Sequence, residues 1–392
     1  MSAPDAIVVG AGVAGLACAR RLRLGGLGVL VVEASDGVGG RVRTDEVEGF
    51  RLDRGFQVLP TAYREVGAIL DLDRLGLRAF ERGAIVRRGG SFHRVADPRR
   101  SPVAALGALR AGVARPGDAL AVARLLRRRG PEATTRDALR DAGLSRSAVD
   151  AFLAPFLRGI FLEPALDTSS RFLEFVLATF SAGPAAVPER GMGAIAEQLA
   201  EGIDVRTDAP VADVEPRSVR LASGERIEAR AVVVATAGLV DDAPDGWRAV
   251  RCLYFDAPRP PLPGAWLVLN GDGEGEGPAN NVTTLTEVSP AYGPPERALV
   301  SVTVLGPGEP DVEAVRRQLE TWFGAEVRRW RLLRTYSLER ALPAWPVGLS
   351  LEQPARTAGG LYACGDHRAH PSLNGALRSG RLAAEAVLAD LA

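Results

Sequence analysis

The chain has 392 residues, which is more than one compact core usually holds and is typical of two domains. Its 46% hydrophobic and 24% charged residues are ordinary for a globular protein, and no stretch approaches the roughly 20 apolar residues of a membrane-spanning helix. The formal net charge of zero gives no overall attraction to nucleic acid or to an anionic surface.

Two details of composition indicate the compartment. Lysine is absent, so all 48 basic residues are arginine. The three cysteines, Cys18, Cys252 and Cys364, lie too far apart for a disulfide framework or a metal site and fit a reducing compartment. The N-terminal residues show no basic segment followed by a cleavable apolar run. We therefore expect a cytoplasmic protein that acts on a small molecule and does not bind nucleic acid.

The beginning of the chain predicts alternating strands and helices. Residues 5–9 and 28–33 are apolar runs suited to buried strands, and residues 13–24 between them have helical spacing of apolar positions. Residues 50–59 then predict extended structure, and residues 61–72 contain a short helix.

The next hundred residues change character. Residues 84–96 predict a hairpin that turns at Gly89 and Gly90. From about residue 101 to residue 180 the apolar period is helical. Breaks in this helical stretch are expected at Pro116, Pro131, Pro155 and Pro164.

Strands predominate in the second half of the chain. The run "AVVVAT" at 231–236 is wholly apolar, as in a parallel sheet that is buried on both faces. The other strands are expected within 204–215, 219–229, 250–305, 331–338 and 360–365. Two helices are expected near 310–323 and 375–391.

This order predicts an α/β protein with a discontinuous domain arrangement. A Rossmann-type nucleotide-binding domain would be assembled from residues 1–83, 184–247 and 339–392. Residues 84–183 and 248–338 would form an α+β substrate domain, and the first of these segments would contribute a helical insertion.

The glycines of "VVGAGVAGL" predict a dinucleotide site. Gly10 permits a tight turn after the first strand, Gly12 lets the backbone approach a pyrophosphate, and Gly15 lets helix and strand pack closely. The phosphates would lie at the positive N-terminus of the helix over 13–24. Glu33 ends the second strand, where a carboxylate can accept hydrogen bonds from a ribose. The adjoining residues expected to share these contacts are Ala14 and Ala34.

A second glycine pair distinguishes the cofactor. In "GVGGRVR", Gly40 lets the main chain pass close to the phosphates, and Arg41 offers a charged fork to their oxygens. A nicotinamide site has no use for this extension. With the C-terminal "LYACGDHRAHPSLNGALRSG", it resembles the flavoenzymes of the monoamine oxidase, protoporphyrinogen oxidase and phytoene desaturase group, especially an unassigned amine-oxidase-like branch of bacterial and plastid proteins. The resemblance implies non-covalently bound FAD.

The resemblance also assigns roles at the C-terminal motif. A strand would end at Gly365 and Asp366, and Asp366 would bond the ribityl chain of the flavin. The backbone around Asn374, Gly375 and Ala376 would face the pyrimidine edge of the flavin ring.

Two internal segments match the same group. "LDRGFQVL" resembles the segment that runs beneath the flavin, which would put Arg54, Gly55, Phe56 and Gln57 near the ring. "DAPVADVE" resembles the strand whose valine, here Val211, packs near the adenine.

The substrate would bind in a mainly apolar cavity with a few polar groups, beside flavin N5. The expected lining residues are Phe56, Gln57, Phe156, Phe161, Tyr336 and Trp345. Each of these aromatic residues could instead belong to the core. The group expected to act in catalysis is Gln57, Tyr336, Trp345 and His370. Tyr336 and Trp345 are included only because "YSLERALPAWPVG" resembles the strand that enters the substrate cavity close to the flavin in the same group.

The candidate acids and bases are few. Many flavin amine oxidases of the resembling group hold a water at N5 with a lysine, and this chain has none. An arginine could hold a water but could not act as a base. His370 could act as acid or base near neutral pH, and it could also be a simple hydrogen-bonding residue. His367 and His370 lie in a turn that must also hold the flavin, so no metal site is expected.

The predicted function is therefore dehydrogenation of a partly apolar substrate by hydride transfer to flavin N5, with reoxidation by oxygen or a quinone. One alternative is a membrane-associated isoprenoid or carotenoid desaturase or isomerase, because residues 101–130 combine apolar positions with clustered arginines. We favour these residues as a cover of the substrate cavity. A second alternative is a flavin-binding protein with little turnover.

Overall fold

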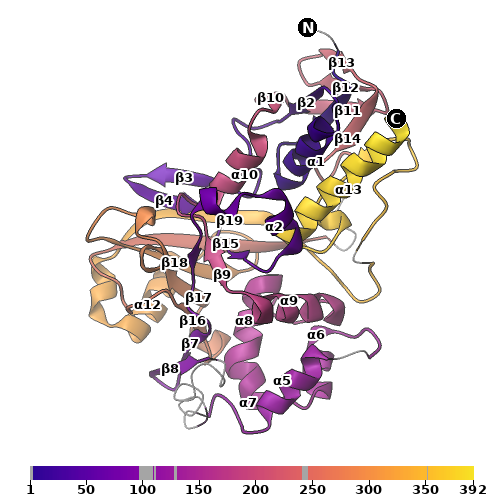
Figure 1. Cartoon of the computed structure of the whole chain (residues 1–392). Helices are drawn as coiled ribbons and strands as arrows, with labels where there is room; N and C mark the ends of the chain where they lie inside the picture. The colour runs from indigo at the N-terminus through magenta and orange to yellow at the C-terminus, as the bar shows by residue number, and fades with distance from the viewer. Residues whose placement is uncertain (1–2, 97–108, 110–111, 128–129, 241–245, 351) are drawn as a thin grey trace.

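The computed structural model describes residues 3–96, 109, 112–127, 130–240, 246–350 and 352–392. Three parts are visible in Figure 1. A parallel sheet with its helices forms the upper part, a large and mainly antiparallel sheet lies across the middle, and a group of helices forms the lower part.

The parallel sheet has five strands drawn from three separated stretches of the chain. In sheet order they are β10 (Asp204–Arg206), β2 (Val29–Val32), β1 (Ala6–Val9), β14 (Ala231–Val234) and β20 (Tyr362–Ala363). All four pairings are parallel. The two central strands, β1 and β14, are fully buried because they are covered on both faces, as the apolar run over 231–236 predicts.

Helices α1 (Val13–Leu24) and α13 (Leu373–Leu391) pack against this sheet and against each other. Gly380 makes the close crossing possible, because a Cβ at this position would lie only 2.2 Å from the carbonyl oxygen of Ala14. Helix α10 (Gly193–Ala200) packs on the other side of α1. The first and last segments of the chain are therefore neighbours in the fold (Figure 1).

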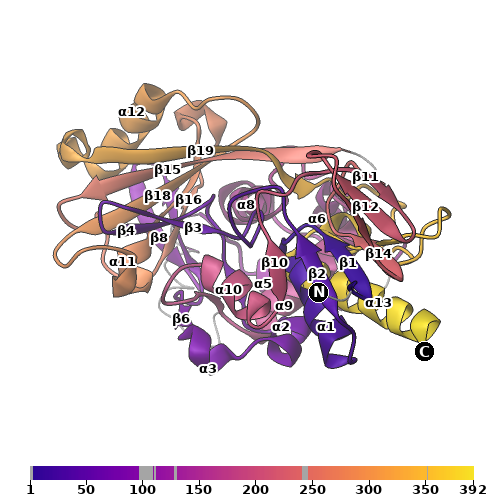
Figure 2. The same cartoon turned by 90° about the horizontal axis from the view of Figure 1, so that it is seen from above.

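The second sheet has seven strands, and its two faces are covered by different helices. In sheet order they are β19 (Arg331–Pro343), β15 (Trp247–Ala257), β18 (Ala298–Leu305), β17 (Ala279–Thr284), β16 (Leu267–Asn270), β7 (Ala84–Arg88) and β8 (Ser91–Val95). Helix α12 (Val312–Phe323) covers one face, and α8 (Ala154–Phe161) packs on the other (Figure 2).

Alternation along β18 assigns its side chains to these two faces. Val300, Val302 and Val304 belong to the apolar cluster beneath α12. Ser301 and Thr303 are buried on the opposite face, on the side of α8. The inner face of the sheet therefore carries buried polar groups, whereas the outer face is apolar.

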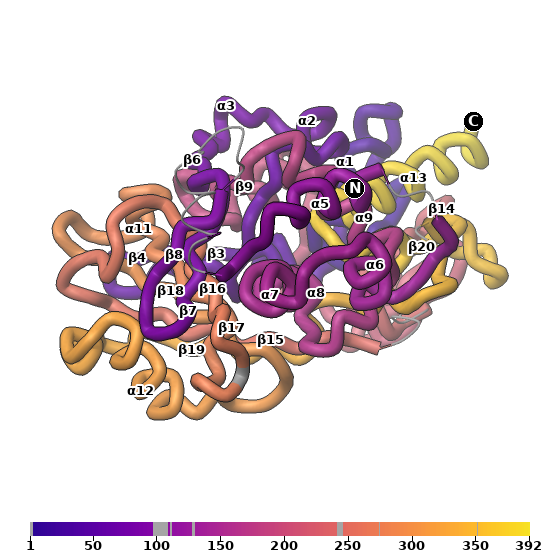
Figure 3. The backbone as a smooth tube through the Cα atoms, turned by 90° about the horizontal axis from the view of Figure 1, so that it is seen from below, coloured from indigo at the N-terminus to yellow at the C-terminus, as the bar shows by residue number. Residues whose placement is uncertain are grey.

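The helices of the lower part gather beside the β7–β8 hairpin when the molecule is seen from below (Figure 3). They are α5 (Asp118–Leu126), α6 (Thr135–Asp141), α7 (Arg146–Ala148), α8, and α9 (Ser170–Ala182), with the π-helical turn η1 (Val149–Leu153) before α8. Residues 101–108, 110, 111, 128 and 129 of the arginine-rich stretch lie outside the described residues, and the helix described within the stretch is α5.

Shorter elements connect the three parts. The remaining strands are β3 (Thr44–Val47), β4 (Phe50–Asp53), β5 (Leu59–Pro60), β6 (Arg78–Ala79), β9 (Ala185–Val187), β11 (Val211–Glu215), β12 (Ser218–Leu221) and β13 (Arg226–Glu228). The remaining helices are α2 (Arg64–Ile69), α3 (Leu72–Leu75) and α11 (Leu285–Val288), with 3₁₀ turns η2 (Glu274–Glu276), η3 (Pro290–Tyr292), η4 (Ala325–Arg329) and η5 (Asp366–Arg368).

Some predicted elements are wrong in detail. The extended stretch over 50–59 ends at Asp53, because Gly55 adopts a φ of +89° and turns the chain. Pro155 does not end the helical stretch, because α8 follows directly on the π-helical turn η1 and Pro155 is its second residue. The helix changes from π to α form immediately before this proline. Pro116, Pro131 and Pro164 do lie outside the helices. The exact domain limits inferred from the sequence remain a prediction.

Candidate active site

A cavity of about 1600 Å³ lies at the junction of the three parts. It extends from the loop after β1, past the loop after β4, to helices α5, α8 and α9 and the inner face of the seven-stranded sheet. One small-molecule site typically occupies about 300–1,000 Å³. This cavity is therefore large enough for an extended cofactor together with a second molecule.

The glycine loop after β1 forms one end of the cavity. Gly10 has a φ of +102°, which favours glycine, and a Cβ at Gly15 would lie 2.0 Å from the carbonyl oxygen of Gly10. A Cβ at Gly12 would meet no protein atom within 4 Å. Gly10, Gly12 and Ala14 line the cavity, whereas Gly15 lies behind them. The space left by Gly12 fits the close approach of a pyrophosphate.

Glu33 lies at the same end of the cavity. Its Oε2 accepts a hydrogen bond of 2.7 Å from the backbone of Ala11, and its Oε1 accepts two from Ser35, at 2.9 and 2.7 Å. These bonds hold the carboxylate at the end of β2 and leave it at the cavity surface. Ala34, expected beside it in the site, is not among the lining residues.

The second glycine pair lies against the first glycine loop. Gly39 donates a backbone hydrogen bond of 2.8 Å to Ala11 and forms a bridge with Gly12. Gly39 and Gly40 have φ values of +110° and +58°, so both occupy conformations that favour glycine. Gly40 lines the cavity, and so does Gly365 from the other end of the chain.

Arg41 and Asp366 meet across the cavity. Nη1 of Arg41 donates to Oδ2 of Asp366 at 2.9 Å, and Nη2 donates to Oδ1 at 2.6 Å. Nη1 also donates to the carbonyl of Ala341 at 2.8 Å, and the guanidinium lies 5.3 Å from the ring centre of Trp247. The sequence predicted separate partners for these two residues on the cofactor, and the structure pairs them with each other.

The loop after β4 forms the middle of the cavity wall, and all of residues 54–57 line it. Arg54 is tied to Asp45 through three hydrogen bonds of 2.9 to 3.3 Å. Nε2 of Gln57 donates to the carbonyls of Arg41 and Arg54, at 2.8 and 3.0 Å. The Gln57 amide therefore fixes the loop and leaves its oxygen free of these bonds.

A buried carboxylate anchors this loop. Asp53 accepts hydrogen bonds from the Thr44 hydroxyl at 2.5 Å, the Met192 backbone at 2.8 Å and the Tyr292 hydroxyl at 2.8 Å. The Tyr254 hydroxyl donates to its carbonyl at 2.8 Å. Burial outweighs these bonds and raises the pKa of Asp53 to about 6. The network joins the end of β4 to β3, to the residue before α10, to η3 and to β15.

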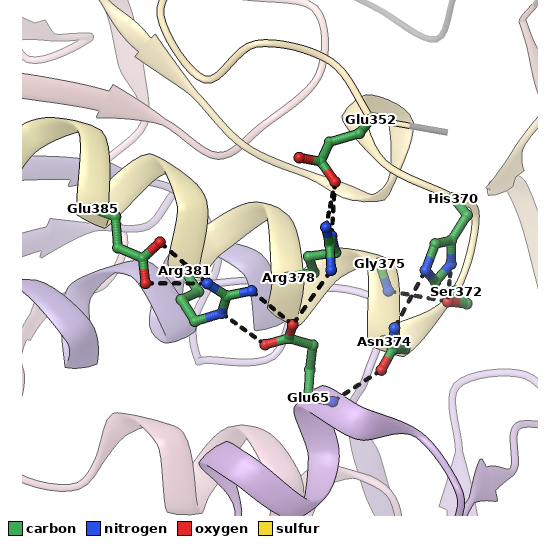
Figure 4. Close-up of polar contacts among 9 residues, drawn as sticks. All are labelled: Glu65, Glu352, His370, Ser372, Asn374, Gly375, Arg378, Arg381 and Glu385. Carbon is green, nitrogen blue, oxygen red and sulfur yellow. Dashed lines mark hydrogen bonds and ion pairs between the residues drawn. The ribbon is translucent and has the colours of Figure 1, made fainter. Parts of the chain in front are cut away.

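The N-terminus of α13 closes the cavity on the side of the last motif (Figure 4). Ser372 caps the helix, because its Oγ accepts from the Gly375 backbone at 3.0 Å. Ser372 and Ala376 line the cavity. Asn374 and Gly375 lie behind them, and Oδ1 of Asn374 accepts from the backbone of Glu65 at 3.1 Å. A helix N-terminus directed at a ligand favours negative charge there.

His370 does not line the cavity. Its Nδ1 lies 2.7 Å from the Ser372 hydroxyl, and its Nε2 lies 3.2 Å from the amide nitrogen of Asn374 (Figure 4). The centre of its ring lies 4.2 Å from that of Phe175. Burial, helped by the charge of Arg378, lowers the pKa of His370 to about 4. This arrangement does not favour the expected catalytic role.

Three other expected residues lie away from the cavity. The Tyr336 hydroxyl donates to Asp45 at 2.7 Å. Trp345 and Phe161 are buried in the protein interior at 1% exposure each. None of Tyr336, Trp345 and Phe161 lines the cavity, whereas Phe56, Gln57 and Phe156 do. Val211 lies on β11 in a separate three-stranded sheet and packs on an apolar cluster there.

The structure adds lining residues that the sequence did not single out. They include Tyr63, Ser372, Asn281 and Thr303, and His367 lines the cavity whereas His370 does not. Burial raises the pKa of Tyr63 to about 12, against an opposing hydrogen bond with Ser372. The available signal for Asn281 and Thr303 was the presence of polar residues within the strands "ANNVTT" and "ALVSVTVL".

Comparison with known proteins identifies the class. Residues 13–388 match the family of flavin containing amine oxidoreductases, and the chain belongs to this family. It is 48% identical over 71 residues to protoporphyrinogen oxidase 2 of Arabidopsis thaliana and 41% identical over 96 residues to putrescine oxidase of Kocuria rosea. These segments cover 18% and 24% of this chain but only 14% and 19% of the relatives.

Solved structures share the whole fold. An oxidoreductase from Methanosarcina mazei superposes with a TM-score of 0.76 at 17% identity, over 98% of this chain and 99% of the other. Wild-type putrescine oxidase bound to putrescine gives a TM-score of 0.66 at 20% identity, again over 98% and 99%. Reduced UDP-galactopyranose mutase gives 0.72 at 16% identity, over 99% and 96%.

The family assigns FAD as the cofactor, held without a covalent link, and places the chain among FAD-dependent oxidoreductases. The cavity fits this cofactor, because the open space at Gly12, the glycine turns and the capped helix N-terminus lie along one wall. The carotenoid desaturase alternative finds no support in these comparisons. No helix among the described residues is long and apolar enough to cross a membrane, and those residues contain no cluster of three or more metal-ligating side chains.

Proposed function

We propose that the chain is an oxidoreductase that dehydrogenates a small, partly apolar molecule bound beside FAD. The observation that carries this proposal is the continuity of the cavity, which joins the glycine loop after β1 to the aromatic wall of α8 and α9. FAD supplies N5 as the hydride acceptor, and oxygen or a quinone would reoxidise it.

The residues at the glycine-rich end would bind the cofactor. Glu33 would accept hydrogen bonds from a ribose, since its carboxylate is already oriented by Ala11 and Ser35. Arg41 would contribute positive charge near the pyrophosphate. Asp366 accepts two hydrogen bonds from that guanidinium, so the pair would set the position of both groups.

The middle of the cavity would orient the reacting bond. The loop that carries Phe56 and Gln57 is fixed by the hydrogen bonds of the Gln57 amide and by the contacts of Asp53. The loop therefore presents a rigid surface to the cavity. His367 and Tyr63 are the lining residues that could hold or move a proton there. The absence of lysine from the sequence excludes a lysine-held water.

The absorption spectrum of the purified protein tests this proposal. Flavin bands that pass into the supernatant after acid precipitation, and that chromatograph as FAD, would support non-covalent binding. A colourless protein that does not take up added FAD would overturn the proposal. Anaerobic bleaching of the bands by a substrate would distinguish an enzyme from a flavin-binding protein with little turnover.

A further inference from the structure

The wide part of the cavity, between helices α8 and α9 and the seven-stranded sheet, is called the chamber below. It is mostly apolar but contains one row of polar residues. Phe152 stacks on Phe156 at 6.0 Å, and Phe156 meets Phe180 edge-on at 5.3 Å. All three line the cavity on the helical side. On the sheet side the lining residues include Asn281 and Thr303, which are both only 3% exposed.

Strand register makes these two residues neighbours. Leu269 is paired with Asn281, Asn281 with Thr303, and Thr303 with Cys252, so the four positions form one row across the inner face of the sheet. The thiol of Cys252 has a hydrogen bond with the backbone of Phe56. The row therefore leads from the apolar chamber to the loop after β4.

A chain of hydrogen bonds fixes the direction of each donor in this row. The carbonyl of Pro155 accepts from Nδ2 of Asn280 at 3.0 Å, which orients that amide. The same Nδ2 donates to Oδ1 of Asn281 at 2.9 Å, so Nδ2 of Asn281 is directed at Thr303 and donates to its Oγ1 at 3.1 Å. The Thr303 hydroxyl accepts in this contact, and its own hydrogen must point elsewhere.

Two donors consequently remain at the cavity surface. Within the described part of the chain, neither the hydroxyl hydrogen of Thr303 nor the second amide hydrogen of Asn281 has an acceptor. Buried donors without an acceptor are unfavourable, so a ligand that supplies an acceptor oxygen is stabilised here. An ammonium group has only donors and cannot satisfy either one.

The carboxylates around the chamber point the same way. Among the described lining residues the carboxylates are Glu33, Glu81, Asp118 and Asp366. Glu33 and Asp366 lie at the cofactor end, and Glu81 is exposed. Asp118 already accepts hydrogen bonds from the backbone of Arg115 and from the backbone and hydroxyl of Ser145. At Asp118 a cation would meet a carboxylate whose acceptor positions are already occupied, and elsewhere in the chamber it would lose its hydration without gaining a counter-charge.

We propose that the chamber selects a neutral, largely apolar substrate that presents one acceptor oxygen, such as a carbonyl, to Thr303 and Asn281. This inference rests on the proposed function, because it specifies the substrate class of the same site. Thr303 and Asn281 would determine specificity, and the aromatic wall would bind the apolar part of the substrate.

Isothermal titration calorimetry of the FAD-loaded protein with three ten-carbon probes tests this inference. We expect 2-decanone to bind at least about tenfold more tightly than decylammonium, which offers no acceptor. Decanoate tests whether the lining arginines Arg82, Arg115 and Arg127 favour an anion instead. Removal of two CH₂ groups, in 2-octanone, should weaken binding by about fifteenfold, since each buried CH₂ contributes about fourfold. Tighter binding of either charged probe than of the ketone would overturn the proposal.

Matched variants on one strand separate a specific contact from a general effect. Thr303→Val removes the donor and keeps the shape, so its affinity for 2-decanone should fall about tenfold. Asn281→Leu should weaken ketone binding in the same direction. Ser301→Ala removes a buried hydroxyl two residues away, outside the cavity lining, and should bind 2-decanone like the wild type. Equal ketone affinity in wild type and Thr303→Val would contradict the assigned contact.

The two proposals fail in different ways. A preparation that shows no flavin bands and takes up no FAD removes the proposed function. A preparation with full flavin bands but no preference for 2-decanone removes only the assignment of the substrate class.

Discussion

Arg41 and Asp366, which are 325 residues apart in the sequence, form a two-pronged ion pair with N–O distances of 2.6 and 2.9 Å. Asp366 is almost buried, whereas the Arg41 side chain is 39% exposed. The pair joins the second glycine motif to the end of the last strand, on the wall where FAD is expected.

Replacement of either residue should weaken FAD binding. We expect Arg41→Met and Asp366→Ala each to raise the dissociation constant of FAD by at least about tenfold, because each loses a charge-assisted contact. Fluorescence titration of the apoprotein with FAD measures this effect. Arg206→Met removes the exposed Arg206–Glu225 pair and should leave FAD affinity unchanged. Wild-type affinity in Asp366→Ala would exclude that residue from the cofactor site.

The two glycines of the first motif should behave differently when substituted. A side chain at Gly12 enters open space, and its φ of −70° suits any residue. Gly12→Val should therefore fold with a free energy of unfolding within about 0.5 kcal/mol of wild type, yet fail to retain FAD. Gly15→Ala places a Cβ 2.0 Å from a backbone oxygen and should lower the free energy of unfolding by at least about 2 kcal/mol. Chemical denaturation and flavin absorbance together measure both effects.

The protonation of His370 should change the stability of the protein, and it should not change the pH dependence of catalysis. Its pKa is lowered from 6.5 to about 4, so the unfolded chain binds a proton between these values while the folded protein does not. The free energy of unfolding should fall as pH drops from about 6.5 to about 4, by up to about 3 kcal/mol from this residue.

His370→Gln should reduce this acid-induced loss, whereas His93→Gln, in the β7–β8 hairpin, serves as the control. Urea denaturation at a series of pH values gives the comparison. Flavin reduction by a substrate should keep its pH profile in His370→Gln, because both ring nitrogens are bonded within the protein. A changed profile with unchanged stability would restore His370 as a catalytic candidate.

The ion pairs of α13 should stabilise its contact with α2, beside the cavity (Figure 4). Glu65 on α2 accepts two hydrogen bonds of 2.9 Å from Arg381, and its side chain is 9% exposed. Arg381→Met leaves this carboxylate largely unpaired, so we expect a loss of about 2 kcal/mol in the free energy of unfolding at pH 7.

The Arg381 contact lowers the pKa of Glu65, so its contribution is complete above the ordinary value of 4.5 and is lost as pH falls through the lowered value. The difference between Arg381→Met and wild type should therefore shrink in acid. Arg190→Met, which removes an exposed pair with Glu197 at 3.4 Å, should change stability by less than about 0.5 kcal/mol. Calorimetric unfolding at two pH values tests both statements.

Local chemistry made several features predictable from the sequence. The turn at Gly10, the strand ending in Glu33 and the buried strand over 231–234 follow from residue type and spacing alone. The same applies to the β7–β8 hairpin at Gly89. Family membership also follows from these motifs, because FAD imposes them on the chain.

Only the tertiary structure determined which distant residues are neighbours and which side chains line the cavity. The sequence could not pair Arg41 with Asp366, remove Trp345 and Tyr336 from the cavity, or exchange His370 for His367 as the lining histidine. It also could not direct the Thr303 hydroxyl into the chamber, since that direction depends on Asn280, Asn281 and a carbonyl on α8. Spacing along the chain determines backbone conformation through local sterics and hydrogen bonds, whereas the polarity of a cavity depends on contacts between residues that are distant in sequence.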